Sequence, residues 1–125
     1  MAVNLTPRVV LEGAAADLAV FVPVIALYLL IGGTTAVAAV GGALVAPFVG
    51  GIVAGRQPTT APLTHGAAAA AAASIAYVVV RIVDAVVRHK PVHPASVAFL
   101  VILAVTVGTG GAWFGFRLRH QDAAE

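Results

Sequence analysis

Charged side chains are absent from one long stretch of this chain, residues 18–55. As a single helix rising about 1.5 Å per residue, this stretch would reach about 57 Å, nearly twice the ~30 Å hydrocarbon core of a bilayer. One transmembrane helix cannot use that length. The pattern therefore predicts two membrane-crossing helices joined by a turn, and the sequence Gly32-Gly33-Thr34-Thr35 is the best place for that turn.

The same pattern predicts four apolar segments of membrane-spanning length within one domain, residues 1–125. These spans are residues 14–31, 35–55, 61–80 and 94–116. Thr6 before Pro7, and Thr60 before Pro62, are typical of helix N-termini, so the first helix is expected to begin near Pro7. Short linkers make consecutive helices antiparallel neighbours. The predicted fold is all-α, a polytopic membrane protein with four transmembrane helices arranged as two tandem hairpins.

The two predicted hairpins open and close on similar sequences. Residues 12–16 resemble residues 65–69, and residues 50–56 resemble residues 110–117. Both hairpins run in the same direction, so a duplication would be a parallel internal repeat about an axis along the membrane normal. Alanine and glycine are abundant in this chain, and chance similarity between the hairpins is the alternative.

The composition agrees with a membrane protein and excludes several kinds of site. Hydrophobic residues make up 61% of the chain and charged residues 10%, against about 25% charged in soluble proteins. There is no cysteine, which excludes disulfides, thiol catalysis and thiolate metal sites. The seven Lys and Arg residues are scattered, whereas nucleic-acid binding requires a clustered basic face.

The positions of the basic residues predict the orientation in the membrane. On one side are Arg8, Arg56, Arg117 and Arg119, and on the other are Arg81, Arg88 and Lys90. Because Lys and Arg are enriched in cytoplasmic loops, this bias predicts a multi-pass protein of the inner (plasma) membrane with both termini in the cytoplasm.

Small residues recur at helical spacing in the second and fourth spans. The glycines of this pattern are Gly42, Gly50, Gly51, Gly55, Gly108, Gly111 and Gly115. Small side chains let transmembrane helices approach closely, which supplies the dispersion energy for their association. We expect these two spans to pack at the centre of the fold. The alternative is that one small-residue ridge binds another copy or a partner.

Asp17 is the most suggestive polar residue in the predicted spans. If Asp17 lay outside the membrane, residues 18–31 would reach only about 21 Å, too short for the hydrocarbon core. Asp17 is therefore expected at or inside the inner boundary, where a carboxylate requires a partner or water. The basic groups expected at similar depth are Arg56, His65 and Arg117, so an ion pair is the main prediction. A proton or ion site, or simple exposure at the interface, are the alternatives.

Three charged residues form one stripe at the outer end of the third span. Arg81, Asp84 and Arg88 have i, i+3 and i+7 spacing, which predicts a solvated, salt-bridged extension of that helix. Contact with lipid head groups or a partner is the alternative.

The sequence contains no recognisable catalytic constellation, and no cofactor or metal is expected. His89 and His93 are four residues apart, but Pro91 between them breaks the helix and no carboxylate accompanies them. Paired carboxylates, a phosphate loop and a dinucleotide fingerprint are absent from the sequence. The chain is therefore not expected to be an enzyme.

One segment carries a resemblance to known proteins. Residues 46–56, Ala-Pro-Phe-Val-Gly-Gly-Ile-Val-Ala-Gly-Arg, are followed by a short polar loop and by His65-Gly66-Ala67. This arrangement resembles small prokaryotic four-helix, glycine-rich integral membrane proteins whose function is not known. The resemblance implies a compact four-helix fold and residence in a membrane, and it implies no activity and no site residues.

Two functional hypotheses follow. The leading one is a non-enzymatic packing or accessory subunit, self-associating or embedded in a larger membrane-protein complex. The alternative is a minimal oligomeric channel or transporter that uses the intramembrane Asp17, with His65 on the pathway. The expected partners are the lipid bilayer and either further copies of the chain or a larger complex, with no nucleic acid. Whether Asp17 faces a wet cavity or an arginine distinguishes the two hypotheses.

Overall fold

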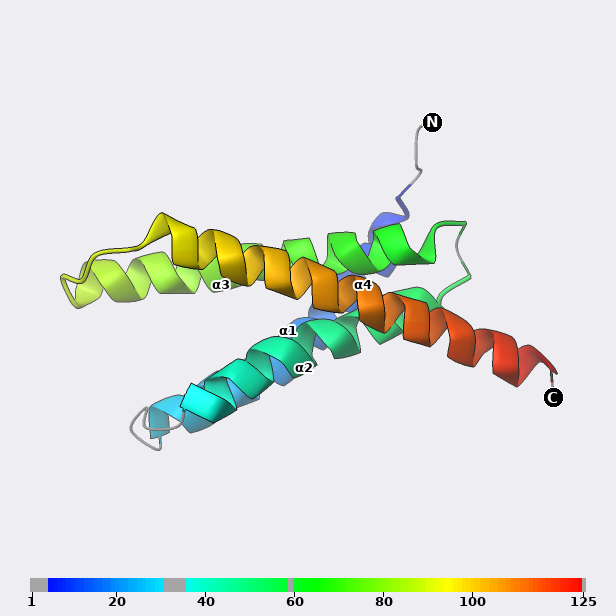
Figure 1. Cartoon of the computed structure of the whole chain (residues 1–125), viewed down its shortest axis with the longest axis horizontal. Helices are drawn as coiled ribbons and strands as arrows, with labels where there is room; N and C mark the ends of the chain where they lie inside the picture. The colour runs from blue at the N-terminus through cyan, green and yellow to red at the C-terminus, as the bar shows by residue number, and fades with distance from the viewer. Residues whose placement is uncertain (1–4, 31–35, 59, 125) are drawn as a thin grey trace.

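The computed structural model describes residues 5–30, 36–58 and 60–124, apart from the side chains of residues 25, 27–29, 36–43 and 80. Its helices are α1 (Pro7–Leu30), α2 (Ala36–Arg56), α3 (Pro62–Val87) and α4 (Pro94–Ala124) (Figure 1). Within these residues there is no strand, so the all-α prediction is confirmed. The turn predicted at residues 32–35 is outside the described residues. The helix α2 begins directly after it, at Ala36.

Proline determines where two of the helices begin. The helix α1 begins at Pro7 as expected, and the carbonyl of Thr6 accepts the N–H groups of Val9 and Val10 at 3.1 and 3.2 Å. Pro62 is in the first turn of α3, but the N-cap is Ala61, which makes no side-chain cap hydrogen bond. The prediction of Thr60 as the cap is therefore wrong. The residue before a proline is disfavoured in helical conformation, which fixes the cap at Ala61.

A left-handed residue ends α3. His89 has φ = 53°, and the N–H of Lys90 donates to the carbonyl of Ala85 at 2.9 Å. This is the hydrogen bond of a Schellman motif, which satisfies carbonyl groups that the helix end leaves free. Pro91 then prevents the helix from continuing. The linker between α3 and α4 consequently occupies residues 88–93.

The two hairpins cross rather than lie parallel. In Figure 1 the α1–α2 hairpin and the α3–α4 hairpin pack together near the start of α1 and separate toward their two turns. Most fully buried positions are small, as at Ala54, Ala69 and Ala112, and His65 is the large exception among the described residues. The helix α2 contacts α3, whereas the equivalent pair in a duplicated fold, α1 and α4, is not in contact over the described residues. The hairpins therefore pack asymmetrically.

The closest contact in the bundle is between α2 and α4. A Cβ added at Gly51 or Gly55 would overlap the backbone carbonyl of Gly108 or Ala112 of α4. In return, a Cβ added at Gly111 or Gly115 would overlap a backbone carbonyl of α2. The side-chain surroundings of Gly42 are outside the described residues. Glycine is required here because the two backbones themselves are in contact.

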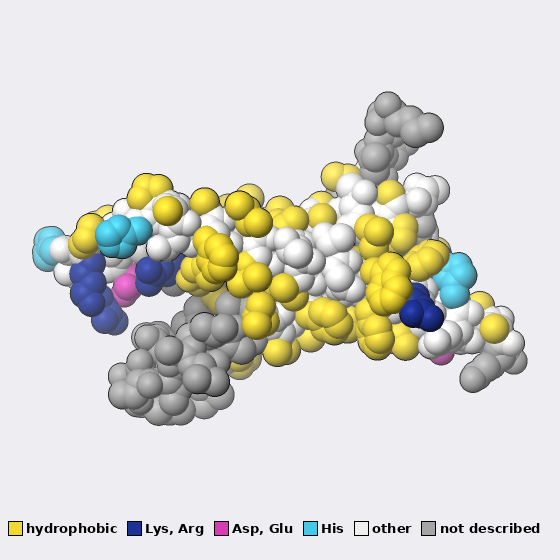
Figure 2. Space-filling view, in the orientation of Figure 1, with side chains coloured by type: hydrophobic (Ala, Val, Ile, Leu, Met, Phe, Trp, Pro, Cys, Tyr) yellow, Lys and Arg dark blue, Asp and Glu magenta, His cyan; other side chains and the backbone are white. Residues whose placement is uncertain are grey.

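The outer surface of the bundle is largely apolar. The helices α3 and α4 are long and apolar enough to cross a membrane, and the described apolar part of α2, Leu44–Arg56, is shorter. Large apolar side chains are exposed, among them Phe99 of α4 at 64%. In the face shown in Figure 2, Lys, Arg, Asp and Glu are confined to the two ends of the molecule, with apolar side chains between them.

Candidate functional site

Asp17 is buried in the interior of the helix bundle. It is on the third turn of α1, about 15 Å along the helix from Pro7. Its side chain packs against α2, where a Cβ added to Gly50 would lie 2.8 Å from the Cβ of Asp17. Only 5% of the residue is exposed. A side chain larger than glycine at position 50 would displace Asp17, so the α1–α2 contact determines where this carboxylate is held.

A cavity of about 40 Å³ lies beside Asp17 and is bounded by all four helices. Its lining residues are Asp17, Phe21, Pro47, Ala73, Ser74, Tyr77, Leu100, Leu103 and Ala104. One water requires about 10–15 Å³ of such space, so two or three waters or one small ion fit. Most of the lining is apolar, and its polar side chains are those of Asp17, Ser74 and Tyr77.

The predicted ion pair of Asp17 is not formed. No ion pair or hydrogen bond to its carboxylate is present among the described residues. Arg56 instead contacts Asp122 of α4 at 3.1 Å, and the guanidinium of Arg117 lies 4.9 Å from the centre of the Trp113 ring. The reason is depth. Asp17 is level with Gly50, which is about 9 Å along α2 from Arg56.

The neighbouring groups present oxygen lone pairs to this cavity. The hydroxyl of Ser74 donates its hydrogen to the carbonyl of Ala70 at 2.8 Å, so toward the cavity its oxygen acts only as an acceptor. The ring of Tyr77 packs edge-on against Phe21, with centroids 5.3 Å apart. The Tyr77 hydroxyl is the donor that the cavity lining supplies, and it makes no hydrogen bond to Asp17 in the described structure.

His65 is fully buried and joins α3 to the start of α1. The N–H of Thr6 donates to Nε2 of His65 at 2.9 Å, and Nδ1 of the same ring is 2.7 Å from the carbonyl of Ala61. Because a backbone N–H only donates, Nε2 must accept, and the ring proton is assigned to Nδ1. The imidazole is therefore neutral and satisfies a backbone donor at the beginning of α1. It is not a partner of Asp17.

A polar cluster that the sequence analysis missed joins the helix ends near the start of α1. Gln57 donates from Nε2 to Glu12 at 2.8 Å, and Arg119 donates to the carbonyl of Gln57 at 2.6 Å. Arg8 contacts Glu12 at 2.8 Å. All of these residues flank the same predicted membrane side, which was the available signal. Which of them meet depends on how the loop after α2 lies between α1 and α4. Neighbouring residues in the sequence do not carry that information.

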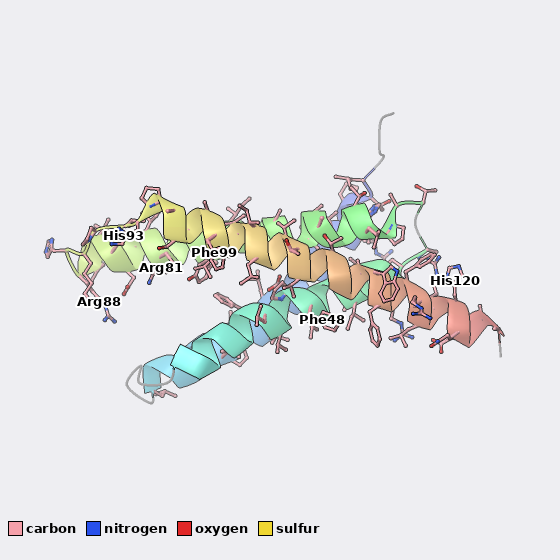
Figure 3. The ribbon with its side chains drawn as sticks, in the orientation of Figure 1. Phe48, Arg81, Arg88, His93, Phe99 and His120 are labelled. Atoms are coloured by element: carbon pink, nitrogen blue, oxygen red, sulfur yellow. The ribbon has the colours of Figure 1, made fainter. Side chains whose placement is uncertain are left out.

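The charged stripe is at the opposite end, on the α3–α4 hairpin. Arg88 contacts Asp84 at 2.8 Å with both side chains substantially exposed, and Arg81 is exposed one turn away. Figure 3 shows Arg81, Arg88 and His93 gathered at this end, far from the crossing of the hairpins. In the part of the chain that the structure describes, no group of three or more His, Cys, Asp or Glu residues forms a metal site.

Comparisons with protein-family models, with curated proteins and with solved structures found no match to this chain. The case for a functional site therefore rests on its geometry. Of the positions that the sequence singled out, Asp17 is the one that combines burial, a cavity and an unpaired carboxylate among the described residues.

Proposed function

We propose that this chain is a four-span protein of the inner (plasma) membrane with both termini in the cytoplasm. The apolar surface, the confinement of charge to the two ends and the distribution of arginines support this arrangement. The helices α1 and α2 have 24 and 21 residues and reach about 36 and 32 Å, enough to cross a ~30 Å core. Asp17 would then lie within the hydrocarbon region.

We propose that the protein handles an ion inside the membrane, as a minimal channel or transporter that works as an oligomer. The observation that carries this proposal is the carboxylate of Asp17, which is buried, faces a cavity and has no basic partner among the described residues. A charged carboxylate in the middle of a bilayer is unfavourable by roughly 2.5–3.5 kcal/mol on insertion scales. Such a group is stable when a proton or a cation neutralises it, and an exchangeable neutralising ion is what transport requires.

A packing or accessory subunit is the second candidate function. It is favoured by the separation of the two hairpins toward their turns (Figure 1), because apolar side chains such as Phe99 remain exposed there. The described residues lie mostly within the four helices, so these faces are what they offer to a partner. In this case Asp17 would serve the fold or the partner contact, and no ion would cross.

Flux measurements in proteoliposomes distinguish the two candidates. We expect the unaltered protein to carry H⁺ or Na⁺ down an imposed gradient, and Asp17→Asn to abolish the flux. Asp84→Asn removes a carboxylate of the exposed stripe and is the matched control, which should retain the flux. Absence of flux from the unaltered protein, together with co-purification of a stoichiometric partner after gentle extraction, would favour the accessory function instead.

A further inference from the structure

The cavity beside Asp17 restricts the kind of ligand that it can hold. Its inner space of about 40 Å³ suits a proton, a bare cation or a few waters, and it is partly open at the bundle surface, so a membrane-soluble reagent can approach Asp17. Its polar groups are mainly acceptors, because Asp17 is a carboxylate and the hydrogen of Ser74 is already donated to Ala70. An anion would meet the like charge of Asp17 and would find the Tyr77 hydroxyl as its donor among the described lining groups, so a charged ligand of this cavity is a cation.

The number of charges further limits the ligand. Among the described residues one carboxylate lines the cavity, and sites for Ca²⁺ or Mg²⁺ ordinarily combine several oxygen ligands and waters with more than one negative charge. The available ligand atoms are hard oxygens: the Asp17 carboxylate and the Ser74 hydroxyl. A single carboxylate of this kind is neutralised by one proton or one singly charged cation.

We infer that the cavity bounded by Asp17, Ser74 and Pro47 binds one hard, singly charged cation, Na⁺ or H⁺. This inference rests on the proposed function, which places the cavity inside the membrane. The ion neutralises the Asp17 carboxylate. Ser74 supplies a lone pair to a bound Na⁺, or accepts the hydrogen bond of a protonated Asp17. The four helices meet at this cavity, so ion binding links both hairpins.

An apolar carbodiimide tests this inference without any variant. Dicyclohexylcarbodiimide partitions into membranes and reacts with protonated carboxyl groups. We expect the protein in lipid nanodiscs to be modified at Asp17, as located by peptide mass spectrometry, and the modification to be faster at lower pH. At constant pH and ionic strength, Na⁺ should slow the modification several-fold relative to choline if Na⁺ occupies the site. Equal rates in Na⁺ and choline would identify H⁺ as the ligand.

Two hydroxyl variants provide the matched comparison. Ser74→Ala removes the cavity oxygen, and it should reduce the protection by Na⁺ while leaving Asp17 reactive. Thr106→Ala removes a hydroxyl that makes the same kind of bond to its own helix, from Thr106 Oγ1 to the Ile102 carbonyl at 2.8 Å, at an exposed position of α4. That control should behave as the unaltered protein. Equal protection in all three proteins would remove Ser74 from the site.

The carbodiimide experiment tests the ion site and the flux experiment tests the transport function, so a negative result in one does not imply a negative result in the other. No modification of Asp17 at any pH, in protein whose helix content and size are normal, would overturn the inference. Modification that depends on neither pH nor Na⁺ would also overturn it. Modification with the expected dependence, but without flux in proteoliposomes, would leave the ion site in place and contradict the proposed transport function alone.

Discussion

Two residues that the sequence pointed to as partners occupy different environments. Asp17 faces a cavity and has no basic neighbour among the described residues, whereas His65 is fully buried with both ring nitrogens at hydrogen-bonding distance from backbone groups. A carboxylate without a donor depends on an ion, while a neutral imidazole with satisfied nitrogens is stable in an apolar interior. The first is therefore a functional candidate and the second is a structural residue.

Replacing His65 by alanine should destabilise the fold. The substitution leaves the N–H of Thr6 without its acceptor and opens space between α3 and α1, and an unsatisfied buried donor costs about 1–3 kcal/mol. Thermal unfolding of the purified protein in nanodiscs measures the effect. His120→Ala, at an exposed position of α4, is the control and should change stability little. A His65→Ala protein as stable as the control would show that the Thr6 contact contributes nothing.

Replacing His89 by glycine should stabilise the protein. His89 has a positive φ that glycine adopts without steric cost. The left-handed conformation costs an L-residue about 1–2 kcal/mol, and the larger conformational entropy of unfolded glycine offsets part of this, so the gain is expected to be about 1 kcal/mol. The neighbouring variant Lys90→Gly lacks this benefit because Lys90 does not have a positive φ. Unfolding temperatures of the two variants, compared with the unaltered protein, check the prediction. A lower value for His89→Gly would contradict it.

At the scale of elements, the α2–α4 pair has the tightest contact between backbones. Gly51 and Gly55 meet carbonyls of α4, and Gly111 and Gly115 meet carbonyls of α2. This reciprocal pattern follows from small residues repeating every four positions on both helices. Gly110 has nothing within 4 Å of an added Cβ, so adjacent glycines in one helix have opposite tolerance for substitution.

The pair Gly111→Leu and Gly110→Leu tests the α2–α4 contact directly. Leucine at 111 would overlap the backbone of Phe48, so α2 and α4 must separate, at a cost of about 1–3 kcal/mol or more. Leucine at 110 extends into open space and should leave the stability nearly unchanged. Thermal unfolding and size-exclusion chromatography measure both effects. Equal stability of the two variants would contradict the backbone contact, and selective loss of oligomer size in Gly110→Leu would reveal a contact between copies.

At the scale of the whole molecule, polar contacts join one end of the bundle and the hairpins separate at the other. Glu12, Gln57 and Arg119 connect α1, the loop after α2, and α4. Toward the turns the hairpins diverge (Figure 1), and the cavity at Asp17 is bounded by helices of both. An ion bound in this cavity would therefore contact both hairpins. A change in the separation of the hairpins would change the size of the cavity.

The proposed topology predicts the compartments of two sites. A reporter fused after residue 125 should be cytoplasmic, and a reporter inserted within residues 88–93 should be on the opposite side, because α4 crosses the membrane between them. Paired reporters, one active only in the cytoplasm and one only outside it, give the readout. The same compartment for both positions would contradict the four-span arrangement.

The sequence alone determined the features that depend on local pattern. Hydropathy indicated apolar helices, and proline fixed the start of α1 at Pro7 and the linker around Pro91. Small-residue spacing indicated the ridges that include Gly51 and Gly111. These features depend on residues within a few turns of one another, because helix formation, proline geometry and partition into lipid are local properties.

Only the tertiary structure decided which of these groups meet. Arg56 seemed level with Asp17 when the helices were counted from their ends, but the packing of α1 on α2 sets Asp17 level with Gly50, about 9 Å along α2 from Arg56. The loop after α2 brings Gln57 to both Glu12 and Arg119, residues far apart in the chain. The position of a residue along a helix follows from the rise per residue, whereas the rotation and crossing of helices are set by how their small-residue ridges fit together.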